Sequence, residues 1–108
     1  MVHFLTIANC HFIMYIGPKG SGSPPHFHRD TVNGLVYGIK HWYLWPPAKA
    51  FFSILHIQDW INQYSYYGNY SDAVECIQLP GDVLYIPDNW GHAVINEEHS
   101  IGFAYEFH

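Results

Sequence analysis

The stretch Gly81–Asn96, GDVLYIPDNWGHAVIN, constrains the fold more than any other part of the chain. Its glycine admits a turn into a short apolar strand, and Pro87 ends that strand. Asn89–Gly91 predicts a tight turn, because asparagine and glycine tolerate left-handed backbone angles. The chain must then reverse, and His92 opens a second apolar strand. The stretch therefore predicts two short strands, with the second carrying a histidine back across the fold.

A second pair of histidines lies far upstream, in His26-Phe27-His28. On an extended strand, residues i and i+2 face the same side, so both imidazoles can reach one ion while Phe27 points away. Alone, the pair is equally consistent with solvated or core histidines. If His92 returns toward this strand, three imidazoles occupy one face of an ion and leave the other face open. We therefore predict one metal site formed by His26, His28 and His92.

Short runs of β-branched and aromatic residues alternate with turn residues along most of the chain, which indicates an all-β sandwich or barrel. Ile54–Tyr64 differs, because its apolar residues have helical spacing and predict one helix. Gly17–Pro25, rich in Gly, Ser and Pro, predicts an irregular loop, and Tyr64–Asp72 a second. The expected strand regions are Val2–Ile16 (one or two strands), Gly34–Trp45, Val74–Leu79, Asp82–Ile86, His92–Ile95 and Ile101–Phe107.

The composition limits the classes of function. With 108 residues, the chain is expected to form a single domain over 1–108. Four Lys and Arg oppose nine Asp and Glu, giving a formal charge of −5, and there is no basic run to bind a phosphate backbone. Direct nucleic-acid binding is therefore not expected. No apolar stretch approaches the ~20 residues of a membrane-spanning helix, and Val2–Ile16 lacks the basic start of a signal peptide.

Two further features bear on the compartment. Cys10 and Cys76 are the only cysteines, too few for a disulfide framework, and are expected to be two thiols rather than one bridge. Asn69-Tyr70-Ser71 is a glycosylation sequon, which has meaning only in the secretory pathway. The residues alone therefore leave the compartment undetermined.

Three blocks, Gly22–His28, Val36–Pro47 and Gly81–Asn96, resemble in this order a JmjC (jumonji C) domain of the cupin superfamily. The resemblance spans about Phe12 to Phe107. It implies a double-stranded β-helix (a cupin or jelly-roll barrel) with one short helical insertion, and an oxygenase that uses Fe(II) and 2-oxoglutarate. The His-Phe-His motif is most similar to an atypical subgroup of the endoplasmic-reticulum lumen.

The resemblance also assigns roles to residues. It makes His26 the first metal ligand and His92 the last, with His28 at a position that normally holds Asp or Glu. Lys40 matches a lysine that pairs with the distal carboxylate of 2-oxoglutarate, and Ser23 matches a hydroxyl that binds the same group. On the residues alone, the less favoured alternative for Lys40 is a surface lysine at the edge of an aromatic strand.

Other positions carry less support. Ala104 stands where many members have an Asn on the last strand, and Tyr37 and Tyr43 are candidate pocket residues. Asp30 is an alternative source of the missing carboxylate if its loop folds back, although a role in a turn is the simpler expectation. Trp42, Trp45 and Tyr43 are expected in the core rather than on a substrate-binding surface.

Three functions fit these residues. The first is an Fe(II)/2-oxoglutarate oxygenase that hydroxylates a protein side chain. The second is a JmjC-like protein that binds metal without turnover and acts through protein contacts. The third is a small three-His cupin that acts on a small molecule without 2-oxoglutarate. Only about twenty residues precede Gly20, so the chain is expected to be a short or N-terminally truncated member. An uncovered sheet edge would favour pairing with another copy.

Overall fold

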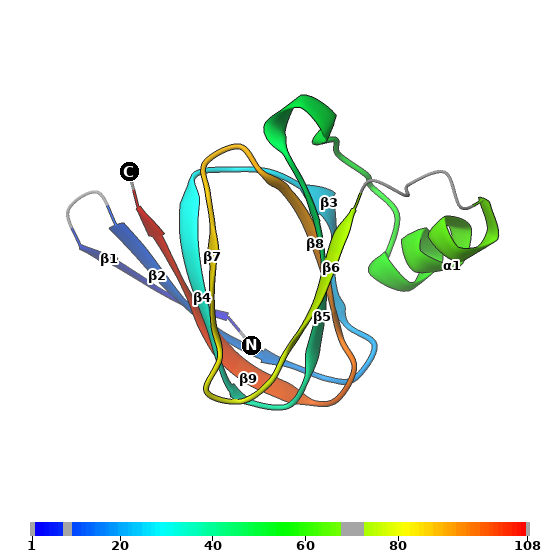
Figure 1. Cartoon of the computed structure of the whole chain (residues 1–108). Helices are drawn as coiled ribbons and strands as arrows, with labels where there is room; N and C mark the ends of the chain where they lie inside the picture. The colour runs from blue at the N-terminus through cyan, green and yellow to red at the C-terminus, as the bar shows by residue number, and fades with distance from the viewer. Residues whose placement is uncertain (1, 8–9, 68–72, 108) are drawn as a thin grey trace.

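The computed structural model describes residues 2–7, 10–67 and 73–107, with the side chains of 12–63 and 73–107. Two antiparallel β-sheets face each other and enclose the interior of a barrel, as Figure 1 shows. The larger sheet has the strand order β1-β2-β9-β4-β7 and the smaller has the order β3-β8-β5-β6. This architecture confirms the predicted double-stranded β-helix with one helical insertion. The elements are β1 Val2–Ile7, β2 Cys10–Gly17, β3 Gly22–His26, β4 Asp30–Tyr37, β5 Lys40–Trp45, the 3-10 turn η1 Pro47–Lys49, α1 Ile57–Tyr67, β6 Val74–Gln78, β7 Val83–Ile86, β8 Gly91–Asn96 and β9 Ser100–Phe107.

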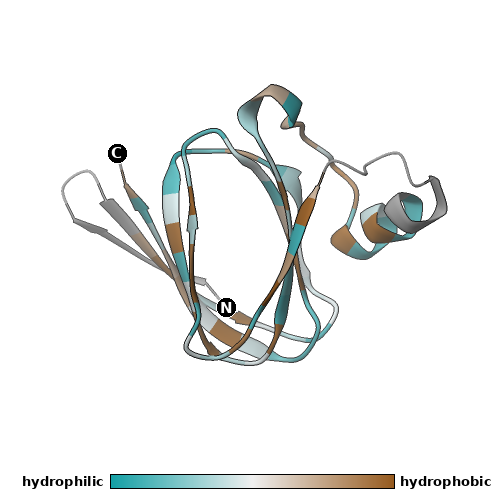
Figure 2. Cartoon of the chain, viewed as in Figure 1, coloured by the Kyte–Doolittle hydropathy of each residue, from teal (hydrophilic) through white to brown (hydrophobic). Residues whose placement is uncertain are grey.

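The smaller sheet is covered on both faces, and the alternation along β5 shows how. Lys40 and Trp42 line the interior of the barrel, whereas Tyr43 and Trp45 belong to a cluster on the opposite face. Successive side chains of a strand point to opposite faces, so this division follows from the period of two. Figure 2 shows hydrophobic and hydrophilic residues alternating along the strands. All six residues of β8 are buried, because β8 lies at the centre of the same covered sheet.

The helix α1 lies outside the barrel and covers the outer face of the smaller sheet (Figure 1). Its Ile57 and Trp60 are almost fully buried against Tyr43 and Trp45. The Trp45 and Trp60 rings meet edge to face, with centroids 5.6 Å apart and an interplanar angle of 85°. Such a pair contributes about 0.5–1.5 kcal/mol beyond the area that it buries. A second cluster, inside the barrel, contains Trp42, Ile86 and Val94.

The predicted loop Gly17–Pro25 is wrong in its second half, because Gly22–His26 forms β3. Ser23 pairs with Val94 and His26 with His92, and the register shifts between these two pairs. The two prolines lie in that irregular part. Proline cannot donate to a β-ladder, but β3 is an edge strand and has a partner on one side only. The edge position therefore admits residues that the sequence pattern assigned to a loop.

Two other boundaries differ from the prediction. Gly34–Trp45 contains two strands, β4 and β5, because Gly38 turns the chain with a φ of 97°. A Cβ at Gly38 would also lie 2.3 Å from the carbonyl oxygen of His99. The helix begins and ends three residues later than the predicted Ile54–Tyr64. Among the described residues, no helix has the length and apolarity needed to cross a membrane.

Cys76 is a free thiol, half-buried in β6. The side chain of Cys10 lies outside the described residues, so the predicted pair of thiols stays a prediction. The sequon Asn69-Tyr70-Ser71 also lies outside them. Asn89, at the predicted tight turn, has a φ of 63°, the left-handed conformation expected from its place between Pro87 and His92.

Candidate metal centre and ligand pocket

Three histidines from two adjoining strands and the loop after β3 converge inside the barrel. His26 and His92 are direct partners in the β3–β8 ladder, and their ring centroids are 4.2 Å apart. His28, two residues beyond His26, places its ring centroid 4.7 Å from that of His92. One ligand atom from each ring lies within 4.8 Å of the others. Bonds of ~2.0–2.1 Å to a common ion require separations of roughly 3–4 Å, so small side-chain shifts bring the three nitrogens onto one ion.

The ring orientations are fixed by backbone carbonyls. His26 Nδ1 lies 2.8 Å from the carbonyl oxygen of Pro24, and His92 Nδ1 lies 3.1 Å from that of Trp90. His28 Nδ1 lies 3.1 Å from the carbonyl oxygen of Arg29. A carbonyl only accepts, so each Nδ1 must carry the hydrogen and donate it. In the neutral rings this leaves Nε2 with a free lone pair, the arrangement in which second-shell hydrogen bonds prepare histidines for metal.

Burial keeps the two β-ladder histidines neutral. Burial, followed by the neighbouring His26 ring, lowers the pKa of His92 to about 3. Burial also lowers the pKa of His26, although its hydrogen bond with Pro24 acts in the opposite direction. Only a neutral imidazole has a lone pair to give to a metal. His26 and His92 are therefore ready to bind a cation at neutral pH.

The turn between β7 and β8 holds the third histidine in place. The amide of Asn89 donates to the carbonyl oxygen of His28 over 2.8 Å. The amide of Asp88 and the hydroxyl of Tyr85 both donate to Asp30 Oδ1, over 3.0 and 2.6 Å. The Asp30 carboxylate thus accepts hydrogen bonds from residues of β7 and the turn after it, and it does not line the cavity. The expected turn role fits its contacts, and the alternative that Asp30 supplies a carboxylate to the metal is wrong in this structure.

A cavity of about 270 Å³ extends from the three histidines along the interior of the barrel. Lys40 lies in this cavity and is only 6% exposed, with Nζ 5.6 Å from the centroid of the Tyr15 ring. Burial lowers the pKa of Lys40 to about 8. No carboxylate of the described residues forms an ion pair with it. Lys40 is therefore an interior amine rather than a surface lysine.

Three polar residues that the sequence reasoning missed surround this amine. Asn96 is the direct ladder partner of Lys40, and Asn33 and Tyr15 line the same cavity. Both asparagines are about 95% buried, and neither Oδ1 has a hydrogen-bond partner among the described residues. A buried polar atom without a partner is costly, so it indicates a place for a ligand or water. The sequence did carry a signal for these residues, because the period of two places each of them on the inward face of its strand.

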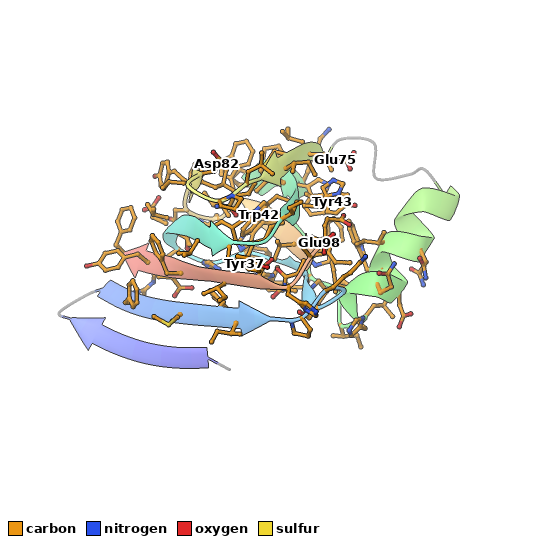
Figure 3. All side chains as sticks on the ribbon, turned by 90° about the horizontal axis from the view of Figure 1, so that it is seen from below. Tyr37, Trp42, Tyr43, Glu75, Asp82 and Glu98 are labelled. Carbon is orange, nitrogen blue, oxygen red and sulfur yellow. The ribbon has the colours of Figure 1, made fainter. Side chains whose placement is uncertain are left out.

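The other predicted residues separate into two groups. Ser23 lines the cavity from β3, and Ala104 lines it from β9 without a polar atom to offer. Trp42 also lines it, with its indole Nε1 donating to Gln78 Oε1 over 2.9 Å. Figure 3, seen from below, shows Trp42 among the side chains between the two sheets. Tyr43 lies in the outer core under α1 and Tyr37 is 61% exposed, so the proposal that they line the pocket is wrong, whereas Tyr43 and Trp45 are core residues as expected.

One carboxylate does reach His28 of the histidine cluster, and the sequence reasoning did not single it out. Glu106, near the end of β9, lines the cavity and places Oε1 3.6 Å from His28 Nε2. In the β4–β9 ladder Glu106 is the partner of Thr31, whose hydroxyl lies 3.3 Å from His28 Nδ1. Gly102, Ala104 and Glu106 share one face of β9, so the period of two places this carboxylate on the inward side.

The barrel that encloses this histidine cluster has the cupin fold. A cupin barrel protein from Salinispora arenicola superposes with a TM-score of 0.66 at 16% identity, over 99% of this chain and 74% of that one. The family can be stated more narrowly. The family model described as "JmjC domain" matches residues 1–108, so the chain belongs to the JmjC family.

Two relatives illustrate the range within that family. JmjC domain-containing protein 8 of Homo sapiens is 35% identical over 89 residues, which cover 80% of this chain and 34% of the relative. The 2-oxoglutarate and iron-dependent oxygenase JMJD4 of Gallus gallus is 30% identical over 111 residues, covering 87% of this chain and 25% of the relative. The chain thus spans about a third or less of each.

Proposed function

We propose that this chain is the metal- and 2-oxoglutarate-binding core of an Fe(II)-dependent oxygenase that hydroxylates a protein side chain. The buried, unpaired amine of Lys40 carries the proposal, because it lies in the same cavity as the three histidines. A dicarboxylate that binds the metal at one end would present its other carboxylate to this amine. The chicken relative named as a 2-oxoglutarate and iron-dependent oxygenase supports the same co-substrate.

Different residues of the chain would bind the metal and the co-substrate. His26, His28 and His92 would hold the ion through their Nε2 atoms, with each Nδ1–H fixed by a backbone carbonyl. When bound, Fe(II) would bring 2-oxoglutarate and dioxygen together and supply the oxidising power for hydroxylation. No other donor set in the described part of the chain forms such a cluster. Imidazole suits Fe, Zn, Cu and Ni alike, so iron is proposed from the family rather than from the donors.

The far end of the cavity would bind the distal carboxylate. Lys40 supplies a positive charge, and the hydroxyls of Ser23 and Tyr15 line the same space. Rotation of the Asn33 amide, whose Oδ1 has no partner, would turn an N–H toward a carboxylate oxygen, whereas Asn96 Nδ2 already donates to Ser21 Oγ. Excluding water strengthens each of these contacts. A charge-assisted hydrogen bond of this kind contributes about 1.5–3 kcal/mol.

The inward position of Lys40 favours this function over a three-His cupin that acts without 2-oxoglutarate, because such a cupin has no need of a buried amine. The reading as a metal-binding protein without turnover is favoured by one observation, the histidine at position 28. Three neutral ligands leave the ion more positive than a set with a carboxylate does. That helps an anionic co-substrate to bind but disfavours oxidation of the metal.

The test is metal analysis of the protein purified without oxygen, followed by an assay of 2-oxoglutarate decarboxylation without added substrate. We expect about one Fe(II) per chain and a slow release of succinate that requires both Fe(II) and oxygen. Metal bound without any decarboxylation would support the protein without turnover. Decarboxylation in a His92→Ala variant that no longer binds metal would contradict the proposed centre.

A further inference from the structure

The carboxylate of Glu106 and the ring of His28 face each other at a distance slightly longer than a hydrogen bond. Glu106 Oε1 lies 3.6 Å from His28 Nε2. His28 Nδ1 lies against the carbonyl oxygen of Arg29, so in the neutral ring the hydrogen is on Nδ1 and Nε2 is an acceptor. A carboxylate oxygen and a ring lone pair that point at each other repel. A cation between them would turn this repulsion into attraction.

The separation fits two ligands of one ion. Bonds of ~2.0–2.1 Å at angles between octahedral and tetrahedral place two ligand atoms roughly 2.9–3.4 Å apart. The observed 3.6 Å is within a few tenths of an ångström of that range. The compact cluster of ligand atoms contains the imidazoles alone, so the Glu106 carboxylate must rotate toward His26 and His92 to share their ion. The side chain of Glu106 is 27% exposed and has room to make this rotation.

Strand pairing fixes the side of the barrel from which the Glu106 carboxylate approaches the histidines. Glu106 is paired with Thr31 across the β4–β9 ladder, and Thr31 contacts the His28 ring with its hydroxyl. Glu106 therefore approaches from the larger sheet, opposite the β3–β8 ladder that carries His26 and His92. An ion between the sheets would be held from both sides of the barrel.

We propose that Glu106 is a fourth ligand and supplies the carboxylate that the histidine triad lacks. This inference rests on the proposed metal centre and deepens it. A divalent ion with three neutral imidazoles keeps a charge of about +2, and one carboxylate lowers it to about +1, as in the two-histidine, one-carboxylate sites typical of Fe(II) oxygenases. Four protein ligands would leave two positions of an octahedron for a bidentate 2-oxoglutarate, so Glu106 would have to leave the ion before dioxygen binds.

The experiment is a titration of the metal-free protein with Co(II), followed by calorimetry and by the visible absorption of the ion. Glu106→Gln keeps the size of the side chain and removes its charge. We expect it to weaken Co(II) binding at least about tenfold and to change the visible spectrum. Glu98→Gln, the same substitution at a residue outside the pocket lining, is the matched control and should change neither. Equal melting temperatures of the metal-free proteins establish that each variant folds.

Two further variants distinguish direct ligation of the metal by Glu106 from a purely electrostatic effect of its negative charge. Glu106→Asp keeps the charge but draws the carboxylate back by one methylene, so a ligand role predicts weaker binding and an altered spectrum. In a His28→Asp background the carboxylate is supplied elsewhere, and Glu106→Gln should then cost less than about threefold, a coupling that a double-mutant cycle measures.

The outcomes are distinct. If wild type binds Co(II) and Glu106→Gln matches it in affinity and spectrum, the role of Glu106 is refuted while the three-histidine centre stands. If Glu106→Asp equals wild type and only Glu106→Gln is weaker, the carboxylate acts through its charge alone, and the ligand role is refuted. If wild type binds no divalent ion, the proposed metal centre and this inference both fail.

Discussion

Lys40 and Asn96 are direct partners on neighbouring strands, and both side chains line the cavity that ends at His26, His28 and His92. Their strands, β5 and β8, lie side by side in the smaller sheet, and Asn96 lies four positions after His92 on the same inward face of β8. This short stretch of β8 therefore sets the distance between the proposed metal centre and the proposed anion site. A ligand with a metal-binding end and a distal carboxylate would have to span that distance.

Lys40→Ala tests the anion site without touching the proposed ligands. We expect metal binding to persist, while the affinity for 2-oxoglutarate falls by about 10–150-fold, as expected for loss of a charge-assisted hydrogen bond of ~1.5–3 kcal/mol. The measurement is calorimetry with the Mn(II)-loaded protein. Lys49→Ala, at an exposed lysine of η1, is the control and should leave the affinity unchanged. Undiminished binding in Lys40→Ala would remove the assigned role of Lys40.

His28→Asp tests whether position 28 limits turnover. The carboxylate lowers the charge of the metal centre and favours its oxidation, so we expect decarboxylation of 2-oxoglutarate to be maintained or raised. His28→Asn, similar in size but uncharged, is the control and should show no gain. Succinate release under oxygen is the measurement. An inert wild type that becomes active only as His28→Asp would establish that the natural chain binds metal without turnover.

The pH dependence of metal binding follows from the lowered pKa values of His26 and His92. Three ordinary histidines, each with a pKa near ~6.5, would make log affinity fall with a slope approaching three per pH unit in acid. Because burial lowers the pKa of His26 and of His92, protons compete less with metal at these two rings. We expect a slope clearly below three between pH 6.5 and 5, measured with Co(II). A slope near three would show that all three rings titrate as in free peptides.

The buried Lys40 predicts a gain of stability at alkaline pH in the metal-free protein. Its folded pKa is about 8, lowered by burial from 10.5. Between these values the unfolded chain binds more protons than the folded chain, so the free energy of unfolding rises with pH across this window and is constant for this group below it. Lys40→Met removes the group and serves as the reference. We expect the melting temperature of wild type, relative to Lys40→Met, to be higher at pH 9.5 than at pH 7.5.

Trp60→Ala tests whether the helix is separable from the site. Trp60, a residue of α1, is 2% exposed. It packs against Tyr43 and Trp45 on the face of the smaller sheet away from the cavity. Loss of a buried Trp costs about 3–5 kcal/mol. We expect that loss of stability by denaturant unfolding, with Co(II) affinity unchanged in the folded protein. A parallel loss of metal binding would show that the outer core positions the histidines.

Several features followed from local sequence alone. The spacing of His26 and His28 places both on one side of the chain, and the turn at Asn89 brings His92 back, because both effects depend on neighbouring backbone geometry. The period of two on β5 placed Lys40 and Trp42 on one face. The directions of these side chains could be predicted, because each depends only on the backbone geometry of a few neighbouring residues.

The tertiary structure decided the rest. The pattern of Gly22–His26 indicates a loop, and only its place at a sheet edge makes it β3. Tyr43 became a core residue because α1 covers that face. Glu106 is 78 residues from His28 in sequence, and the β4–β9 register alone brings it to 3.6 Å. The period of two could place Asn33, Asn96 and Glu106 on the inward faces of their strands. Strand pairing across such separations depends on the free energy of the whole barrel, so no local pattern could bring the three residues to one site.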